Sequence, residues 1–348
     1  MKAVVFDEFG PPDVLEVTEM PEPEPGPGEV MVRVGAVSVG RTLDIAARAG
    51  ALPFANIELP HIPGAEHAGV VAALGTGVGG LQEGERVAVS PVLTCGECRY
   101  CRCGHEDACP NLRLIGVHGP GAYAEYTVVP ASNVQRIEDD LSDVEASALA
   151  LSGPAAQQQL REAGVEKESW VLVQAAGSAL GSLTTALAVH RGARVVATSR
   201  QQWKREALAA LGIEAALDWT EPDFPERVRE LTGGAGIDVA IDNIGSAPMW
   251  DSTVPTLARR GTVVTSGAFV GDTVCVDLRA LYTNGHRILG VRTGDRASVE
   301  ELWRAVSAGF RPVVDRSFPL EAASEAHSYV EADQNFGRVA LIVNGADG

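Results

Sequence analysis

The chain has 348 residues, 45% of them hydrophobic and 21% charged, so it can bury a large core, and this composition excludes disordered, collagen-like and coiled-coil proteins. Because the formal net charge is −18 at pH 7 and no basic run offsets it, nucleic acid is excluded as a partner. Glycine or charge interrupts every apolar stretch well before the roughly 18 residues of a membrane span, so we expect a cytoplasmic protein without membrane contact or signal peptide.

Short strand-like runs separated by glycine and proline turns occupy the N-terminal part of the chain. The runs are residues 3–6, 29–34, 69–73, 86–89 and 122–129. The stretch rich in proline, glutamate and glycine at residues 21–28 is short and has strands on both sides, so we interpret it as a rigid turn. These patterns predict a β-rich first domain.

From Trp170 onward, apolar strands alternate with helical patterns. Strands are predicted at residues 171–173, 194–197, 238–241 and 262–264, with helices at 183–191 and 204–211. This alternation is typical of a doubly wound parallel sheet, so the sequence predicts an α/β fold. A helix at 299–308 and strands near Val313 and at 339–343 do not continue the alternation, and we expect them to return to the first domain.

A turn of small residues follows the first of these strands and precedes a helix. Such a turn lets the backbone approach a pyrophosphate, and the helix N-terminus supplies N–H groups for its charge. A tight turn without a ligand is the alternative, but the position at the first strand of a βαβ series favours dinucleotide binding. The predicted binding residues are Gly177, Ser178, Ala179, Leu180 and Gly181.

The end of the second strand distinguishes the two nicotinamide nucleotides. An NAD site carries Asp or Glu there for the ribose 2′-hydroxyl, whereas this strand is followed by Ser199 and Arg200, with Lys204 one turn further on. A hydroxyl and two cations suit a 2′-phosphate. The sequence therefore predicts NADPH, and the alternative is that both cations are ordinary solvated charges at a helix start.

Five of the six cysteines lie between residues 95 and 109, which is unlike a disulfide framework. The spacing of Cys95, Cys98, Cys101 and Cys109 provides four soft ligands for one structural Zn²⁺ in a closed tetrahedron, with Cys103 as an extra thiol. Free reduced cysteines are the alternative. Four neighbouring thiols without a metal would be prone to oxidation, which favours the zinc site.

The β-rich start, the cysteine cluster, the glycine turn, the run Gly261 to Gly267 and the ending Phe336 to Val339 resemble the medium-chain dehydrogenase/reductase superfamily over essentially the whole chain. The resemblance implies a GroES-like catalytic domain (residues 1–151 and 292–348, with a structural-zinc lobe at 92–112) and a Rossmann domain (152–291). It places the nicotinamide between them. It also implies a homodimer that pairs a strand at residues 273–277, and further cofactor contacts at Gly267, Ala268, Phe269, Trp219 and Arg338.

Zinc alcohol dehydrogenases of this superfamily also bind a catalytic zinc, whose three ligands this chain lacks. Arg41, Ala65 and Ser152 stand at the expected ligand positions. Glu66 and His67 together would still lack the third ligand of a catalytic zinc site. The resemblance therefore implies a chain without catalytic zinc, similar in its active site to the quinone oxidoreductases.

Without a Lewis acid, hydride addition to a conjugated double bond is easier than reduction of an isolated ketone. We therefore expect an NADPH-dependent reductase of a small-molecule enone, quinone or unsaturated iminium. Arg41 with Thr42 would stabilise the enolate, and His67 or water would protonate it. Alternatively, Arg41 only forms a buried ion pair with Glu66, and Asp44 only orders the turn. A carbonyl reductase and a non-catalytic NADPH-binding protein are the other candidate functions.

Overall fold

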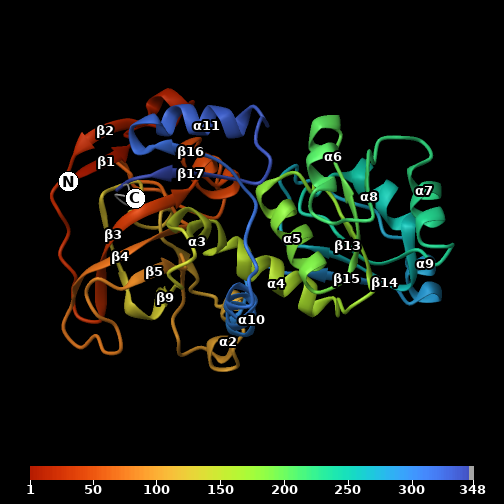
Figure 1. The fold of residues 1–348 in the computed structure, drawn as a ribbon, viewed down its shortest axis with the longest axis horizontal. Helices are drawn as coiled ribbons and strands as arrows, with labels where there is room; N and C mark the ends of the chain where they lie inside the picture. Colours follow the sequence, from red (N-terminus) through yellow and green to blue (C-terminus); the bar gives the residue numbers. More distant parts are fainter. Residues whose placement is uncertain (345–348) are drawn as a thin grey trace. The chain divides into compact units, whose positions relative to one another are not determined.

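The computed structural model describes residues 1–344 and divides the chain into two compact units (Figure 1). Unit 1 contains Met1–Leu151 and the chain from Val314 onward, and unit 2 is Ser152–Val313. The first boundary agrees with the predicted domain boundary at residue 151. The second lies at residue 313 instead of 291, so the predicted extent of the Rossmann domain was too short.

Unit 1 is built on a seven-stranded sheet with the order β16-β17-β3-β4-β5-β9, to which β8 adds by pairing with β3. A separate antiparallel hairpin, β1–β2, precedes it. The strand bounds are β1 Lys2–Val5, β2 Glu16–Glu19, β3 Glu29–Ser38, β4 His67–Leu74, β5 Arg86–Val89, β8 Tyr126–Pro130, β9 Val134–Arg136, β16 Val314–Pro319 and β17 Arg338–Ile342.

The core of unit 1 is made mainly by β-branched residues that alternate along β3, β4 and β5, as expected for strands with a packed face. A second cluster joins β1, β16 and β17 to α11 through residues such as Val4, Phe318 and Leu341. The helical segments are η1 Pro12–Val14, η2 Arg41–Ile45, α1 Ala46–Arg48, α2 Arg99–Arg102, η3 Glu106–Ala108, η4 Ala131–Asn133, α3 Asp143–Leu149, η6 Leu320–Ala322 and α11 Ala323–Glu331.

Unit 2 contains a parallel six-stranded sheet with the order β12-β11-β10-β13-β14-β15. This is the strand order of a doubly wound dinucleotide-binding sheet, whose order reverses between its first and fourth strands, here β10 and β13. The bounds are β10 Trp170–Val173, β11 Arg194–Thr198, β12 Ala215–Leu217, β13 Ile237–Ile241, β14 Leu257–Thr265 and β15 Arg287–Gly290. The predicted α/β class and doubly wound sheet are confirmed.

The helices of unit 2 pack on this sheet and on one another. They are α4 Ser152–Glu162, α5 Ala179–His190, α6 Gln202–Ala209, α7 Phe224–Leu231, α8 Ala247–Thr253, η5 Val254–Thr256, α9 Leu278–Asn284 and α10 Arg296–Ser307. No helix among residues 1–344 combines the length and apolarity that crossing a bilayer demands.

Helix α10 is the reason that the second domain boundary was misplaced. It packs against α4, where Leu302 lies so close to Gly153 that a side chain at that glycine would collide with it. Arg161 of α4 also pairs with Asp295, the N-cap of α10, at 2.5 Å. The apolar face of α10 and this ion pair therefore keep the helix in unit 2.

The strand expected at residues 273–277 was also wrong. These residues form no strand within the described chain, and β15 is the edge of the sheet next to β14. The prediction came from the family resemblance and the apolar side chains of this segment, but Val274 instead packs against the core cluster that contains Trp250 and Val263.

Candidate active site and metal centre

Cys95, Cys98, Cys101 and Cys109 come together in unit 1 with all four sulfur atoms within 4.8 Å of one another. The Sγ atoms of Cys98 and Cys101 are 3.5 Å apart, and those of Cys95 and Cys109 are 3.6 Å apart. A tetrahedron with Zn–S bonds of about 2.3 Å has sulfur atoms roughly 3.8 Å apart, so the four side chains fit a structural zinc. Cys103 is exposed and lies outside this set.

The lobe that carries these cysteines contains little regular secondary structure. A two-stranded ladder closes its base, between β6 (Val92–Leu93) and β7 (Arg113–Leu114). Backbone N–H groups of Glu97 and Cys98 lower the pKa of the Cys95 thiol to about 6, whereas burial raises that of Cys101 to about 11. A bound cation would favour the thiolate at all four positions.

The predicted catalytic turn forms a five-residue π-helical segment, η2, which follows β3. Its residue Asp44 is fully buried and accepts hydrogen bonds from the N–H groups of Gly40, Gly64 and Ala65 at 2.7, 3.1 and 3.0 Å. Burial raises the pKa of Asp44 to about 6 although these donors lower it. Asp44 therefore ties the turn to the segment that carries Glu66, which supports an ordering role.

Glu66 forms its ion pair with Arg338 of β17, with Oε2 and Nη2 2.6 Å apart. Both side chains are nearly inaccessible, at 6% and 4% exposure, and the other oxygen of Glu66 accepts the N–H of Leu151 at 3.0 Å. Arg338 is thus an ion-pair partner of Glu66 that the sequence analysis did not identify. The predicted contact of Arg338 with the cofactor stays a prediction.

The guanidinium of Arg41 donates to the carbonyl oxygen of Val330 in the last turn of α11. A cation is favourable there because unpaired carbonyls give the helix end a partial negative charge. Arg48, which is buried, pairs with Glu331 at 2.5 Å. Two arginines from one short segment therefore hold η2 and α1 against the end of α11. Thr42, between them in the chain, is exposed.

His67 lies on β4, opposite Val37 and Val89 on the two neighbouring strands. It is completely buried, and burial lowers its pKa to about 4, so the ring is neutral at physiological pH. The ring is therefore uncharged and shielded from solvent, and its predicted role as proton donor stays a prediction.

Among residues 1–344, the four cysteines are the single group of three or more His, Cys, Asp or Glu side chains placed to hold a metal. Ala65 and Ser152 stand where the second and third catalytic ligands were expected, and neither residue type commonly binds zinc. The four-cysteine cluster thus fits one zinc ion, and the absence of a catalytic zinc stays a prediction.

The predicted dinucleotide turn lies at the carboxyl end of β10, beside the point where the strand order reverses. Ser178 is the N-cap of α5, and its Oγ accepts the N–H of Gly181 at 3.1 Å. Gly181 lies against the carbonyl oxygen of Ala175, where a side chain would collide. A Cβ at Gly177 would lie 2.7 Å from Cδ of Lys204, so this lysine packs directly on the turn.

The three predicted phosphate-binding residues lie in the segment that follows β11 and in the first turn of α6. Ser199 and Lys204 are largely buried, at 8% and 3% exposure, whereas Arg200 is exposed. Arg205 was missed by the sequence analysis. It donates to the carbonyls of Ser199 and Arg200 at 2.7 and 2.9 Å and pairs with Asp218 at 3.3 Å, which fixes the shape of this segment.

The remaining predicted cofactor residues follow β12 and β14. Trp219 is half-buried against the core of unit 2, and Gly267 and Ala268 begin the loop after β14. Phe269 in this loop is 57% exposed. Next to the loop, Asn243 accepts hydrogen bonds from Gln159 at 2.7 Å and from the backbone of Ser266 at 3.2 Å, a partly buried network that the sequence analysis did not identify.

Comparisons with known proteins agree with this architecture. Residues 26–139 match the family described as alcohol dehydrogenase GroES-like domain, and residues 179–308 match zinc-binding dehydrogenase. An NAD-dependent alcohol dehydrogenase of Sulfolobus acidocaldarius is 31% identical over 351 residues, which cover 99% of this chain and 100% of that protein.

Two solved structures are similar over nearly the whole chain. One, of an NAD-dependent alcohol dehydrogenase, has a TM-score of 0.91 and 36% identity, covering 99% of this chain and 100% of the other. A mycobacterial quinone oxidoreductase has a TM-score of 0.80 and 29% identity, covering 98% and 99%. The chain belongs to the zinc-type medium-chain dehydrogenase/reductase superfamily, as its resemblance indicated. It is an oxidoreductase of that superfamily.

Proposed function

We propose that this protein is a cytoplasmic, NADPH-dependent reductase that adds hydride to an activated carbon–carbon double bond without a catalytic zinc. The observation that carries the proposal is the replacement of all three expected ligands by Arg41, Ala65 and Ser152, in a chain that keeps the four-cysteine site. An enone, quinone or unsaturated iminium is the substrate class, because its conjugated system accepts the negative charge that zinc would otherwise stabilise.

The bound nicotinamide supplies the hydride, and the residues of the two units supply binding and charge stabilisation. The turn at Gly177 to Gly181 and the N-terminus of α5 would hold the pyrophosphate. Arg41 carries five N–H donors, and with the hydroxyl of Thr42 it would steady the developing enolate. Because His67 is buried and neutral, water is the better proton source for the α-carbon.

An assay of NADPH oxidation with matched pairs of enones and saturated ketones tests this proposal, with zinc counted on the same sample. We expect turnover of enones and one zinc per chain. Faster reduction of the saturated ketones, or a second zinc, would instead support an alcohol dehydrogenase, the activity named for the relatives above. Tight NADPH binding without oxidation of any substrate would indicate a non-catalytic binding protein.

We expect NADPH to bind more tightly than NADH, by about 1.5 to 3 kcal/mol for each charge-assisted hydrogen bond to the 2′-phosphate. Substitution of the exposed Arg200 by Asp should remove this preference, because a carboxylate repels the phosphate and accepts from a ribose hydroxyl. Titration of both nucleotides measures the effect. Arg259→Asp is the matched control, since Arg259 is also an exposed arginine of unit 2. Equal affinities in the wild type would show that these cations are only solvated.

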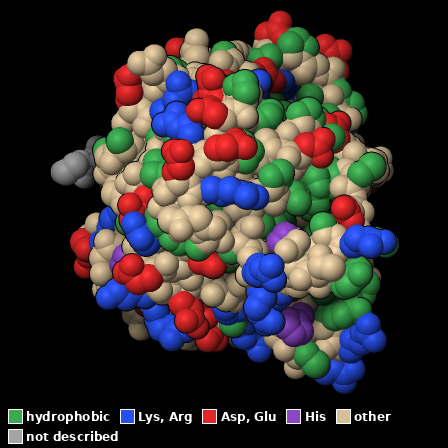
Figure 2. All heavy atoms as spheres, turned by 90° about the vertical axis from the view of Figure 1, so that its right-hand side faces the viewer, with side chains coloured by type: hydrophobic (Ala, Val, Ile, Leu, Met, Phe, Trp, Pro, Cys, Tyr) green, Lys and Arg blue, Asp and Glu red, His purple; other side chains and the backbone are tan. Residues whose placement is uncertain are grey.

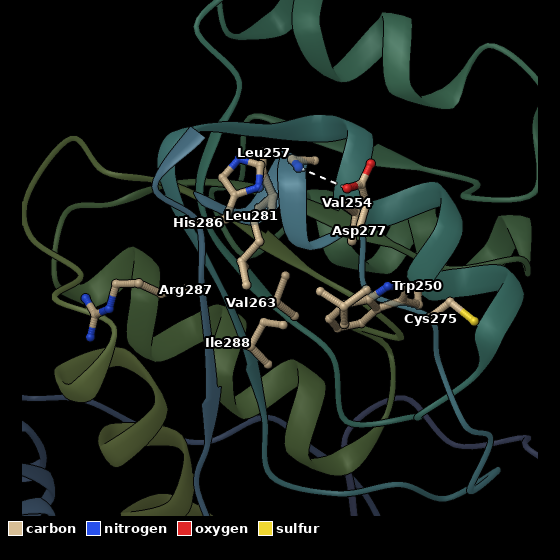
Figure 3. A pocket seen from close by; sticks show the side chains of 12 residues that line it. Trp250, Val254, Leu257, Val263, Cys275, Asp277, Leu281, His286, Arg287 and Ile288 are labelled. Atoms are coloured by element: carbon tan, nitrogen blue, oxygen red, sulfur yellow. Dashed lines mark hydrogen bonds between the residues drawn. The ribbon is translucent and has the colours of Figure 1, made fainter. Parts of the chain in front are cut away.

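The free edge of the unit 2 sheet supports the homodimer. Leu278, Tyr282 and Ile288 are 71%, 72% and 44% exposed on α9 and β15. Figure 2, which faces the end of unit 2 with α7 and α9, shows hydrophobic side chains gathered among charged ones. A pocket of about 50 Å³ is lined by Trp250, by Leu281 of α9 and by Ile288 of β15 (Figure 3). An exposed edge strand beside apolar side chains is suited to pairing with a second copy.

Sedimentation at micromolar concentration should therefore give a dimer. Ile288→Lys should give a monomer, because a lysine on an edge strand opposes strand pairing. Val17→Lys is the control, since Val17 on β2 is also 44% exposed but lies in unit 1. A wild-type monomer, or a dimer that withstands Ile288→Lys, would reject this interface.

A further inference from the structure

Ala175 has an unusual backbone conformation at the start of the dinucleotide turn. Its φ is +50°, in the left-handed region that residues with a side chain rarely adopt. Dinucleotide-binding turns carry their first glycine at this point, and glycine adopts positive φ without a steric penalty. Contacts with other residues must therefore stabilise the positive φ of Ala175 in this chain.

Thr198, the last residue of β11, contacts the turn twice. Its Oγ1 accepts the N–H of Ala175 at 3.2 Å, and its carbonyl oxygen accepts the N–H of Ala176 at 2.9 Å. Thr198 is completely buried, so no water competes for these bonds. The carbonyl of Ala175 in turn accepts the N–H of Ser178, the N-cap of α5, at 3.0 Å. Rotation of Ala175 would thus disturb the start of the helix.

The hydroxyl of Thr198 is itself oriented by a buried chain of hydrogen bonds. It donates to Oε1 of Gln174 at 2.6 Å, Nε2 of Gln174 donates to Oγ1 of Thr253 at 2.7 Å, and Thr253 donates to the carbonyl of Met249 at 2.7 Å. Because a backbone N–H stands at one end and a backbone carbonyl at the other, every group in the chain has one possible direction. All three side chains are at most 1% exposed.

We propose that Gln174, Thr198 and Thr253 are positioning residues that keep Ala175 in its left-handed conformation and so preform the turn for the pyrophosphate of a nicotinamide nucleotide. The inference depends on the dinucleotide binding in our proposed function, but not on the preference for NADPH, because both nucleotides share the pyrophosphate. Losing the hydrogen bond to Ala175 would reduce the population of the binding-competent turn, and the apparent affinity would fall by the same factor.

Thr198→Val tests the proposal because it keeps the shape of the side chain and removes its hydroxyl. We expect the dissociation constants of NADPH and NADH, measured by calorimetry on the zinc-loaded full chain, to rise by about threefold to tenfold. Thr198→Ser should restore them. The matched control is Thr232→Val, since Thr232 is also buried in unit 2 and accepts a backbone N–H, from Gly236, at 2.9 Å. It should lower stability without weakening either nucleotide.

Ala175→Gly separates positioning from a merely structural role. Glycine needs no help to adopt positive φ, so in this background Thr198→Val should change nucleotide affinity by less than about twofold. An equal loss of affinity in both backgrounds, or no loss in Thr198→Val itself, would overturn the proposal. If Thr198→Val does not fold, Thr253→Val interrupts the same chain from its far end, and unchanged affinities there would overturn it equally.

The wild-type titration distinguishes this inference from the proposed function. Tighter binding of NADH than of NADPH would contradict the proposed phosphate site, while the effect of Thr198→Val on NADH would still support the positioning role. A wild type that binds neither nucleotide would overturn both.

Discussion

Replacement of Arg338 by alanine is expected to lower the free energy of unfolding by about 3 to 5 kcal/mol, because it removes the guanidinium that pairs with the buried carboxylate of Glu66. The two side chains are 2.6 Å apart and only 4% and 6% exposed, so water cannot readily take the place of the guanidinium. Equilibrium unfolding in urea measures the loss. Arg33→Ala is the control, since Arg33 is an exposed arginine on β3 of the same unit.

The double variant Arg338→Ala/Glu66→Ala isolates the cause. Removing both charges should recover part of the stability, since no unpaired carboxylate then remains, although the N–H of Leu151 loses its acceptor. A double variant as unstable as Arg338→Ala would show that lost packing outweighs the charge. The nucleotide affinity of the folded Arg338→Ala protein tests separately whether Arg338 contacts the cofactor. A large loss would support the predicted cofactor contact of Arg338, and no loss would leave it a structural residue.

The partner of Glu66 shows why the site was harder to predict than the fold. The strand Arg86–Val89 and the alternation in unit 2 were predicted correctly because periodicity along the chain encodes them. The sequence placed Glu66 near Arg41 by family pattern alone, and nothing in it pointed to an ion pair between Glu66 and Arg338. That pairing arises only when β17 adds beside β3.

Two predictions about unit 2 were wrong for a similar reason, the strand at residues 273–277 and the domain to which helix α10 belongs. The strand at residues 273–277 was predicted from the family resemblance, but the edge of the sheet is β15, and local sequence does not reveal which segment joins a sheet. Helix α10 was correctly expected and wrongly assigned, because its contacts with α4 are made by residues distant in the sequence. The four cysteines were predicted correctly as one cluster, because their spacing along the chain is short and their side chains are typical zinc ligands.

That metal site leads to the second large effect. Cys98→Ser is expected to abolish the binding of the single zinc ion and to unfold the lobe between β6 and β7, which has little regular structure to hold it otherwise. Structural zinc contributes about 10 to 16 kcal/mol of apparent binding free energy in small zinc domains, so the loss is far larger than that of one hydrogen bond. Metal analysis and limited proteolysis of the lobe measure it.

Cys103→Ser is the matched control for Cys98→Ser, because Cys103 is an exposed cysteine of the same lobe outside the four-sulfur cluster. It should retain one zinc per chain and resist proteolysis like the wild type.

Cys98→Ser should still bind NADPH within about twofold of the wild type, since the dinucleotide turn belongs to unit 2, which has its own sheet and core. Full zinc content in Cys98→Ser, or equal zinc loss in Cys103→Ser, would contradict the assigned ligand set. Loss of nucleotide binding together with the zinc would show instead that the stability of unit 2 depends on the metal lobe of unit 1.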